Sequence, residues 1–419
     1  MKVNIRNEKE SDYQAVEDMT RKAFYNLYVP GCIEHYLVHI MREHEDFIPE
    51  LALVIERDGR VIANIMYTKA KLIDTDKNEK QVLTFGPISV LPEYQRQGYG
   101  KMLMEYSFEK AVSMGYDAKI TVKGGVLIDL GGRDETDGLL LEAHADTLGG
   151  MVAEVKSNGR LRLTALGGMQ AANGETENVR VYTRNGRVVE GTLQLVNASV
   201  HVNGDYASTN RSFDTTEVVL DEDVKNAQDT RNLGIEVGDI VCFEPRTRVT
   251  ATGYIKSRFL DDKLSVGILL GLAKYMKDKN VTPARRVYAH VTVYEEVGHG
   301  GSGSVPAGVT EAISVDMGCV GEGLTCTERQ VSICAKDSGG PYSYDVVGAL
   351  IEAAKAEGAD YAVDVYPHYG SDVEATLRSG VDIRHGLIGA GVYASHGYER
   401  SHVDGVWNSL KVLKGYLKI

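Results

Sequence analysis

The chain has 419 residues, a length that predicts two to four domains at roughly 100–200 residues each. Its 59 acidic and 46 basic residues give a formal net charge of −13, which argues against non-specific binding to nucleic acid or to an anionic membrane. No apolar stretch approaches the ~20 residues of a membrane helix, and we expect no secretory signal. Five cysteines without a CxxC spacing favour a reducing, cytoplasmic location.

The first part of the chain, up to about residue 118, predicts a small α/β segment. An opening strand is followed by helices and then by a hairpin, with strands at 51–56 and 60–67 around an Asp-Gly turn. A further strand is expected at 82–90, and a helix at about 100–114.

The middle of the chain changes pattern. Strands are expected at 122–130 and 138–143, broken by a polar turn. From about 150 to 250, short β runs recur with turn signals every ~8–12 residues, a spacing typical of a small β-barrel or sandwich. We therefore expect a β module inserted into a larger domain.

After residue 250, helices and strands alternate, which predicts an α/β domain with a mostly parallel sheet. The expected elements are a helix at 264–277, strands at 286–294 and 312–316, and helices at 343–357 and after residue 405.

Metal-ligand side chains follow several of these predicted strands. Sites in open α/β sheets form at the carboxyl ends of the strands. Each candidate alone has a plainer role, such as a helix cap for an aspartate, but together they offer mixed nitrogen and oxygen donors that suit zinc, cobalt or manganese. The candidates are His144 and Asp146 in HADTLGG, Asp261 in FLDDKLSV, Glu295 and Glu296 in YEEVGHGG, Asp316 in SVDMG, and His396 or its rival His402 in ASHGYERSH.

These motifs, with HYGSDVEAT, occur in an order that resembles the tetrahedral-aminopeptidase (glutamyl aminopeptidase-like) family of dinuclear metallopeptidases. The resemblance covers about residues 120–419 and implies two divalent metal ions, a peptide substrate and a homo-oligomer. It also implies that the inserted β module lines the substrate pocket. The implied roles are Asp261 as the bridge between the metals, His144 and Asp316 at one metal, Glu296 and His396 at the other, Glu295 as the general base, and Asp146 as the residue that orients His144.

A second motif lies in the first part, where VLPEYQRQGYGK joins a predicted strand to a helix start. Glycines at such a place let successive backbone N–H groups face a pyrophosphate. The stretch resembles motif A of the GNAT acetyltransferases, which bind acetyl-CoA, and the likeness covers about residues 1–118. The implied cofactor-binding residues are Val90, Gln95, Arg96, Gln97, Gly98, Tyr99, Gly100 and Lys101.

Both resemblances break off at the junction near residue 118. The GNAT-like segment lacks the later strand, helix and hairpin of that family, and the peptidase part lacks the usual family opening. A natural fusion, a chimera or an assembly error would each produce this junction.

The predicted fold is an α/β metallopeptidase domain (119–149 and 251–419) with an inserted β-barrel domain (150–250), preceded by a truncated GNAT-like segment (1–118). The leading function is a metal-dependent aminopeptidase that uses a two-metal-activated water. The alternatives are a GNAT N-acetyltransferase with an inactive peptidase scaffold, and a non-catalytic binding or assembly subunit. We expect neither a nucleic acid nor a membrane among the partners.

Overall fold

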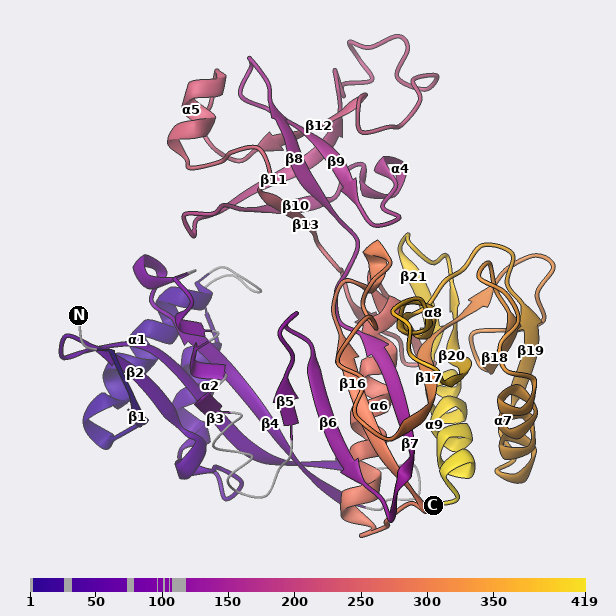
Figure 1. Cartoon of the computed structure of the whole chain (residues 1–419). Coiled ribbons are helices and arrows are strands. Elements are labelled where there is room, and N and C mark those ends of the chain that lie inside the picture. The colour runs from indigo at the N-terminus through magenta and orange to yellow at the C-terminus, as the bar shows by residue number, and fades with distance from the viewer. Residues whose placement is uncertain are drawn as a thin grey trace. The chain divides into compact units, whose positions relative to one another are not determined.

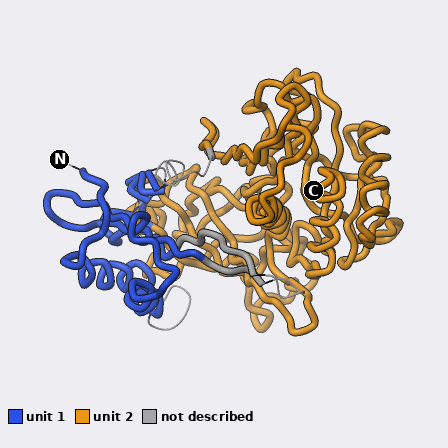
Figure 2. Tube along the Cα trace, turned by 90° about the horizontal axis from the view of Figure 1, so that it is seen from below, with its two compact units in different colours: residues 1–118, 185–187 blue, residues 119–184, 188–419 orange. Residues whose placement is uncertain are grey.

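The computed structural model of the chain (Figure 1) falls into two compact units, which are coloured separately in Figure 2. The first comprises Met1–Ala118 with Asn185–Arg187, and the second comprises Lys119–Arg184 with Val188–Ile419. The described residues are 3–25, 32–73, 79–95, 97–100, 102–104, 106–107 and 118–419.

The first unit contains a four-stranded antiparallel sheet in the order β1-β2-β3-β4. Asp58 and Gly59 both have positive φ angles, which suits the tight turn between the two hairpin strands. Val16 of helix α1 packs into the core of this unit. The elements are β1 (Val3–Asn7), α1 (Tyr13–Phe24), α2 (Glu34–Met41), β2 (Leu53–Arg57), β3 (Arg60–Ile73) and β4 (Glu79–Val90).

The predicted hairpin at 51–67 is confirmed by β2 and β3. The strand expected at 82–90 is the second half of β4. Most of the helix expected at about 100–114 lies outside the described residues.

Six strands of the second unit close into a barrel in the order β10-β11-β12-β9-β8-β13. Alternate residues such as Val179 and Val181 are buried and fill its interior, as a small barrel requires. The β module expected at 150–250 is therefore a barrel and not a sandwich. Its elements are β8 (Gly149–Val155), β9 (Leu161–Leu166), α4 (Ala171–Gly174), β10 (Asn178–Tyr182), β11 (Val188–Leu195), β12 (Thr216–Leu220), α5 (Ala227–Asn232) and β13 (Ile240–Phe243).

The rest of the second unit is built on an eleven-stranded sheet. Its central strands β16, β7, β17 and β20 run parallel, whereas the flanking strand pairs β16–β6 and β20–β21 are antiparallel. The strands are β5 (Ala118–Ile120), β6 (Val126–Gly131), β7 (Asp134–His144), β14 (Arg248–Val249), β15 (Tyr254–Ser257), β16 (Arg285–Thr292), β17 (Val309–Val320), β18 (Val331–Lys336), β19 (Tyr361–Val365), β20 (Arg384–Tyr393) and β21 (Glu399–His402).

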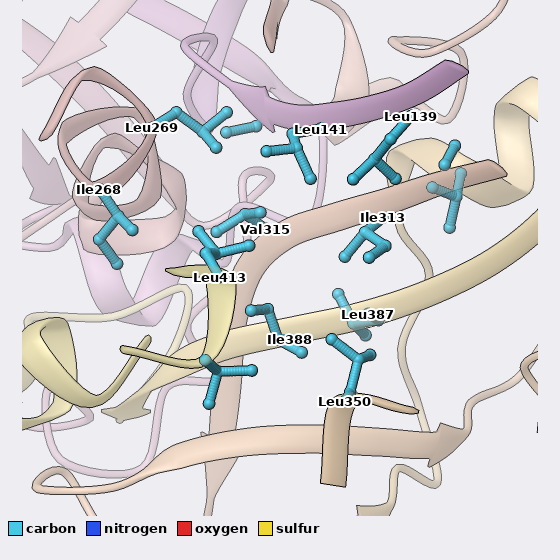
Figure 3. Close-up of a cluster of buried hydrophobic side chains, with 14 of the residues drawn as sticks. Leu139, Leu141, Ile268, Leu269, Ile313, Val315, Leu350, Leu387, Ile388 and Leu413 are labelled. Carbon is cyan, nitrogen blue, oxygen red and sulfur yellow. The ribbon is translucent and has the colours of Figure 1, made fainter. Parts of the chain in front are cut away.

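Helices α6 (Leu260–Asp278), α7 (Tyr344–Ala356), α8 (Asp372–Arg378) and α9 (Val403–Leu417) pack with this sheet. Figure 3 shows the buried core, in which leucine and isoleucine side chains of the central strands meet those of the helices. Among the helices that the structure describes, none combines the length and the apolar composition of a bilayer span. The mixed sheet, its helices and the closed barrel confirm the predicted α/β class.

Candidate metal centre

The carboxyl ends of the central strands bring together side chains from five separate segments. His144 is the last residue of β7, and Asp316 lies within β17. Asp261 stands in the non-helical first turn of α6, where its ψ angle is 101°. Glu295 and Glu296 form a short 3-10 turn after β16. The fifth segment, between β20 and β21, contributes His396, whose φ angle is 64°.

The Asp261 carboxylate lies between two imidazoles. Its Oδ1 atom is 3.0 Å from Nε2 of His144, and its Oδ2 atom is 3.5 Å from Nε2 of His396. On the His396 side, Oε2 of Glu296 is 3.8 Å from the same Nε2 atom. On the His144 side, Oε2 of Glu295 lies 3.7 Å from Nε2 of His144. One carboxylate therefore faces two half-sites.

Two sets of three ligand atoms lie within 4.8 Å of one another in the part of the chain that the structure describes. One set is His144, Asp261 and Glu296, and the other is His144, Asp262 and Asp316. A spacing of up to 4.8 Å is close to twice a metal–ligand bond of about 2.0–2.2 Å, so a small side-chain adjustment would let a single cation contact every atom of a set. Four of the five expected ligands belong to these sets, His396 adjoins them through its 3.5 Å contact with Asp261, and Asp262 joins them.

Asp146 links His144 to the loop of the two glutamates. Its Oδ1 atom lies 3.5 Å from Nδ1 of His144, and its backbone oxygen lies 3.2 Å from the same nitrogen. Its carboxylate also accepts hydrogen bonds from the backbone N–H groups of Glu295 and Glu296, each at 3.2 Å. Asp146 thus contacts both the His144 ring and the backbone of the glutamate pair.

Several acidic side chains are buried close together here, and this shifts their pKa values. Burial, followed by the nearby charge of Asp261, raises the pKa of Glu296 to about 8. Burial and Asp261 likewise raise the pKa of Asp316 to about 6. Burial and the charge of Asp316 raise the pKa of Glu295 well above its usual range. Burial would also raise the pKa of Asp261, but hydrogen bonds with His144 and His396 outweigh it and lower that pKa.

Several buried carboxylate oxygens in this cluster have no hydrogen-bond partner among the described residues. They are Oδ1 of Asp262, Oε1 of Glu296 and Oδ1 of Asp372. An unpartnered buried carboxylate oxygen is costly, and a bound cation is one of the few groups that relieves the cost. The donor set of imidazoles and carboxylates fits zinc, cobalt or manganese.

His402, the rival of His396, lies away from this cluster. It caps helix α9, where its Nδ1 atom accepts a hydrogen bond from the backbone N–H of Asp404 at 3.0 Å. Its Nε2 atom is 2.8 Å from the backbone oxygen of Thr252. Both ring nitrogens are therefore engaged in holding the backbone.

A cavity of about 680 Å³ opens on the cluster. Its wall includes Asp261, Glu295 and His396, together with Gly168 and Asn173, which follow barrel strand β9 in the chain. The cavity is large enough for several residues of an extended peptide, since ligand pockets of ~300–1,000 Å³ hold drug-sized molecules.

Sequence reasoning missed two residues of this site. Asp262 accepts a hydrogen bond from the backbone N–H of His144 at 3.1 Å, and its only sequence signal is its place beside Asp261. Glu399 accepts hydrogen bonds from the backbone around both Asp261 and His396. The only sequence signal for Glu399 is that an acidic residue stands inside the tail motif, and the sequence does not show that this residue is buried.

The expected cofactor-binding residues of the first unit lie at the end of β4 and in the loop after it. The Gln95 amide donates to the backbone oxygen of Val90 at 3.0 Å, and Gly98 has a φ angle of 85°. The backbone oxygen of Gly98 accepts from Met102 at 2.9 Å, which marks the start of a helix. Gln97, Tyr99 and Gly100 lie in the same turn, whereas Arg96 and Lys101 lie outside the described residues.

Comparison with known proteins identifies the two parts. The family model of the M42 glutamyl aminopeptidases matches residues 124–412, and that of the acetyltransferase (GNAT) family matches residues 21–126. YhfE of Bacillus subtilis (strain 168), provisionally named an aminopeptidase, is 41% identical over 296 residues, which cover 71% of this chain and 86% of YhfE. The glutamyl aminopeptidase of Lactococcus lactis subsp. cremoris (strain MG1363) is 26% identical over 51% of this chain and 60% of its own length.

Solved structures agree on the fold. The TET aminopeptidase of Thaumarchaeota archaeon SCGC AB-539-E09 aligns with a TM-score of 0.67 and 17% identity over 75% of this chain and 90% of its own. The TET1 peptidase of Pyrococcus horikoshii, which can assemble into a tetrahedron or a large octahedral shell, aligns with a TM-score of 0.64 and 20% identity over 76% and 94%. The M42 family model matches more than half of this chain, and the chain therefore belongs to the M42 glutamyl aminopeptidase family.

Proposed function

We propose that this chain is a metal-dependent aminopeptidase that removes the N-terminal residue of a peptide with the help of two divalent ions. The observation that supports this most strongly is the Asp261 carboxylate, whose two oxygens face His144 and His396 at 3.0 and 3.5 Å. A carboxylate whose two oxygens face separate imidazoles can bridge two cations, one beside each ring.

In this proposal each half-site has its own ligands. His144 and Asp316 would hold one ion, Glu296 and His396 would hold the other, and Asp261 would serve both. The unpartnered Oε1 atom of Glu296 supports this assignment, because a cation would satisfy it. When bound, two such ions lower the pKa of a water and polarise the scissile carbonyl.

The remaining residues handle the proton and the geometry. Glu295 takes a proton from the attacking water and passes it to the leaving amine. Burial and the charge of Asp316 raise the pKa of Glu295, so its carboxylate holds the abstracted proton until the amine accepts it. Asp146 keeps the His144 ring in the orientation that presents Nε2 to the ion.

The experiment that tests this function is chromogenic hydrolysis by the full chain. We expect release of p-nitroaniline from aminoacyl p-nitroanilides with a free amino group, loss of release after chelation, and recovery with zinc, cobalt or manganese. Release from N-acetylated analogues should be absent. No release from any free-amine substrate in the presence of all three metals would contradict the proposal and would favour a non-catalytic subunit.

We propose that the chain has three parts and that several copies of it form a homo-oligomer. Residues 119–149 and 251–419 form the catalytic domain, residues 150–250 are the inserted barrel domain, and residues 1–118 are a GNAT-like segment. The assemblies named for the TET1 peptidase support a homo-oligomer of this chain as well. All five cysteines are free thiols, which suits the cytoplasm.

A second proposed function is binding of acetyl-CoA by the first unit. The positive φ angle of Gly98 and the helix start at that residue support it, because backbone N–H groups at such a turn can face a pyrophosphate. CoA should raise the thermal unfolding temperature of the full chain, whereas adenosine should not. An unchanged temperature at millimolar CoA would contradict this function and the acetyltransferase alternative together.

A further inference from the structure

Glu399 is the first residue of β21 and is only 2% exposed. Its Oε2 atom accepts hydrogen bonds from the backbone N–H groups of Leu260 at 2.6 Å and Asp261 at 3.1 Å. Its Oε1 atom accepts from the backbone N–H of His396 at 3.0 Å. One buried carboxylate therefore joins two chain segments, although 138 positions separate Glu399 from Asp261.

Both segments need such a partner. Leu260 and Asp261 stand at the N-terminal end of α6, where backbone N–H groups have no partner within the helix. His396 has a φ angle of 64°, a left-handed conformation that is unfavourable for a non-glycine residue and persists only where its surroundings hold it. A carboxylate is the strongest acceptor that a side chain can offer to these donors.

The hydrogen bonds to Glu399 bring the side chains of Asp261 and His396 close together. With their backbones held on one carboxylate, Asp261 and His396 bring Oδ2 and Nε2 to 3.5 Å from each other. Glu399 itself reaches its partners through their backbone N–H groups, so it takes no part in the chemistry.

We infer that Glu399 is a positioning residue for one half-site of the metal centre, because its buried carboxylate sets the backbone of Asp261 and His396 so that both side chains meet one divalent cation. This inference rests on the proposed function. It predicts an unequal effect, since Glu399 holds the backbone of two ligands of this half-site, Asp261 and His396, but of only the bridging Asp261 in the other.

The test is metal titration of the metal-free full chain with Zn²⁺, comparing wild type with Glu399→Gln. The glutamine side chain keeps one acceptor oxygen and places an NH₂ group where the other carboxylate oxygen was. The hydrogen bonds to one of the two segments, either Leu260 and Asp261 or His396, are therefore lost. We expect the variant to bind the ion at Glu296 and His396 about 10–100-fold more weakly, the usual loss when a group behind a ligand is changed, and the other ion more weakly by a smaller factor. Activity should return at high Zn²⁺ concentration.

The matched control is Glu328→Gln. Glu328 pairs with Arg400, the neighbour of Glu399, at 3.2 Å and makes no hydrogen bond to a proposed ligand in the described structure. This variant should bind both ions as wild type does. Equal unfolding temperatures of the metal-free variants would show that the loss concerns the metal site and not the fold.

Two ions bound by Glu399→Gln with wild-type affinities would overturn the inference. If this variant does not fold, Glu399→Asp replaces it, because a carboxylate one methylene shorter reaches only one of the two segments. The Glu399→Asp variant should bind the same ion more weakly, and unchanged affinities would overturn the inference equally. If wild type itself binds no divalent ion, the proposed function fails and the inference fails with it.

Discussion

The Nε2 atom of His144 lies 3.0 Å from the Oδ1 atom of Asp261, although 117 positions separate the two residues. The contact arises because β7 ends where helix α6 begins, so a strand end and a helix start face each other across the site. Both side chains are buried, at 1% and 9% exposure. Asp261 is therefore a charge partner of His144, and the proposed metal centre is built around that pair.

Replacing Glu295, the proposed general base, should stop turnover without removing the bound metal. Glu295→Gln keeps the shape of the side chain but removes its ability to take a proton. We expect kcat to fall about 10²–10⁴-fold, the usual share of a general base, while the metal content stays unchanged. Steady-state kinetics together with metal analysis checks this. Glu352→Gln, at an exposed helix position, is the control, and a Glu295→Gln enzyme as fast as this control would refute the role of Glu295.

The residue behind His144 should control metal affinity. Asp146→Asn puts an NH₂ group where a carboxylate now faces Nδ1 of His144 and accepts from the Glu295 and Glu296 backbone. The expected result is about 10–100-fold weaker metal binding, measured by competition with a chromophoric chelator. Binding as tight as in wild type would mean that Asp146 does not support the site.

Metal binding should strengthen as the pH rises. A carboxyl group must lose its proton before it can ligate, and burial holds the pKa of Glu296 at about 8 and that of Asp316 at about 6. The dissociation constant should therefore fall between about pH 6 and pH 8, with protons released on binding. Titration calorimetry in two buffers of different ionisation enthalpy measures that release. A dissociation constant that is constant across this range would contradict the raised pKa values of the two carboxyl groups.

A carboxyl pair outside the metal cluster should make stability depend on pH. Burial and a hydrogen bond with Asp337 raise the pKa of Glu374 to about 7, from a usual value of 4.5. Because the folded pKa is the higher one, this stabilisation is complete below about pH 4.5 and disappears as the pH rises to about 7. Relative to Glu374→Gln, wild type should lose at most about 3 kcal/mol of unfolding free energy over that interval, at about 1.4 kcal/mol per pKa unit.

Denaturant unfolding of both proteins at several pH values measures this difference. The comparison with the glutamine variant removes the contribution of the metal-site acids, which both proteins share. A difference in unfolding free energy that is the same at about pH 4.5 and about pH 7 would show that Glu374 does not titrate in this way.

The fold could be predicted where the side-chain pattern was regular. The hairpin of β2 and β3 alternates around an Asp-Gly turn, and α7 and α9 carry clear helical patterns. Strand β20 was missed, because its glycines resemble turn signals. They are needed there for packing, since a Cβ at Gly389 would lie 2.0 Å from the backbone oxygen of Asp316. Helix α6 is assigned from Leu260, but Asp261 and Asp262 have non-helical backbone angles, so its regular part begins close to residue 264, where the helix was expected.

The signal for a site residue was clearest where a ligand directly follows an apolar strand. His144 shows this pattern, and the parallel order of the central strands then gathers such residues at one edge. Asp262 and Glu399 could not be predicted in this way. They act through backbone N–H groups 118 and 139 positions away, and a sequence pattern carries no information on such contacts.

The central claim is that distant segments of the second unit hold a pair of divalent ions around Asp261. The most direct test is the metal content of the purified full chain after loading with zinc, cobalt or manganese and removal of free ions, beside Asp261→Asn. We predict two ions per wild-type chain and a large loss of both in the variant, because the bridge serves both half-sites. A wild-type chain without bound metal, or a variant that keeps both ions, would contradict the claim.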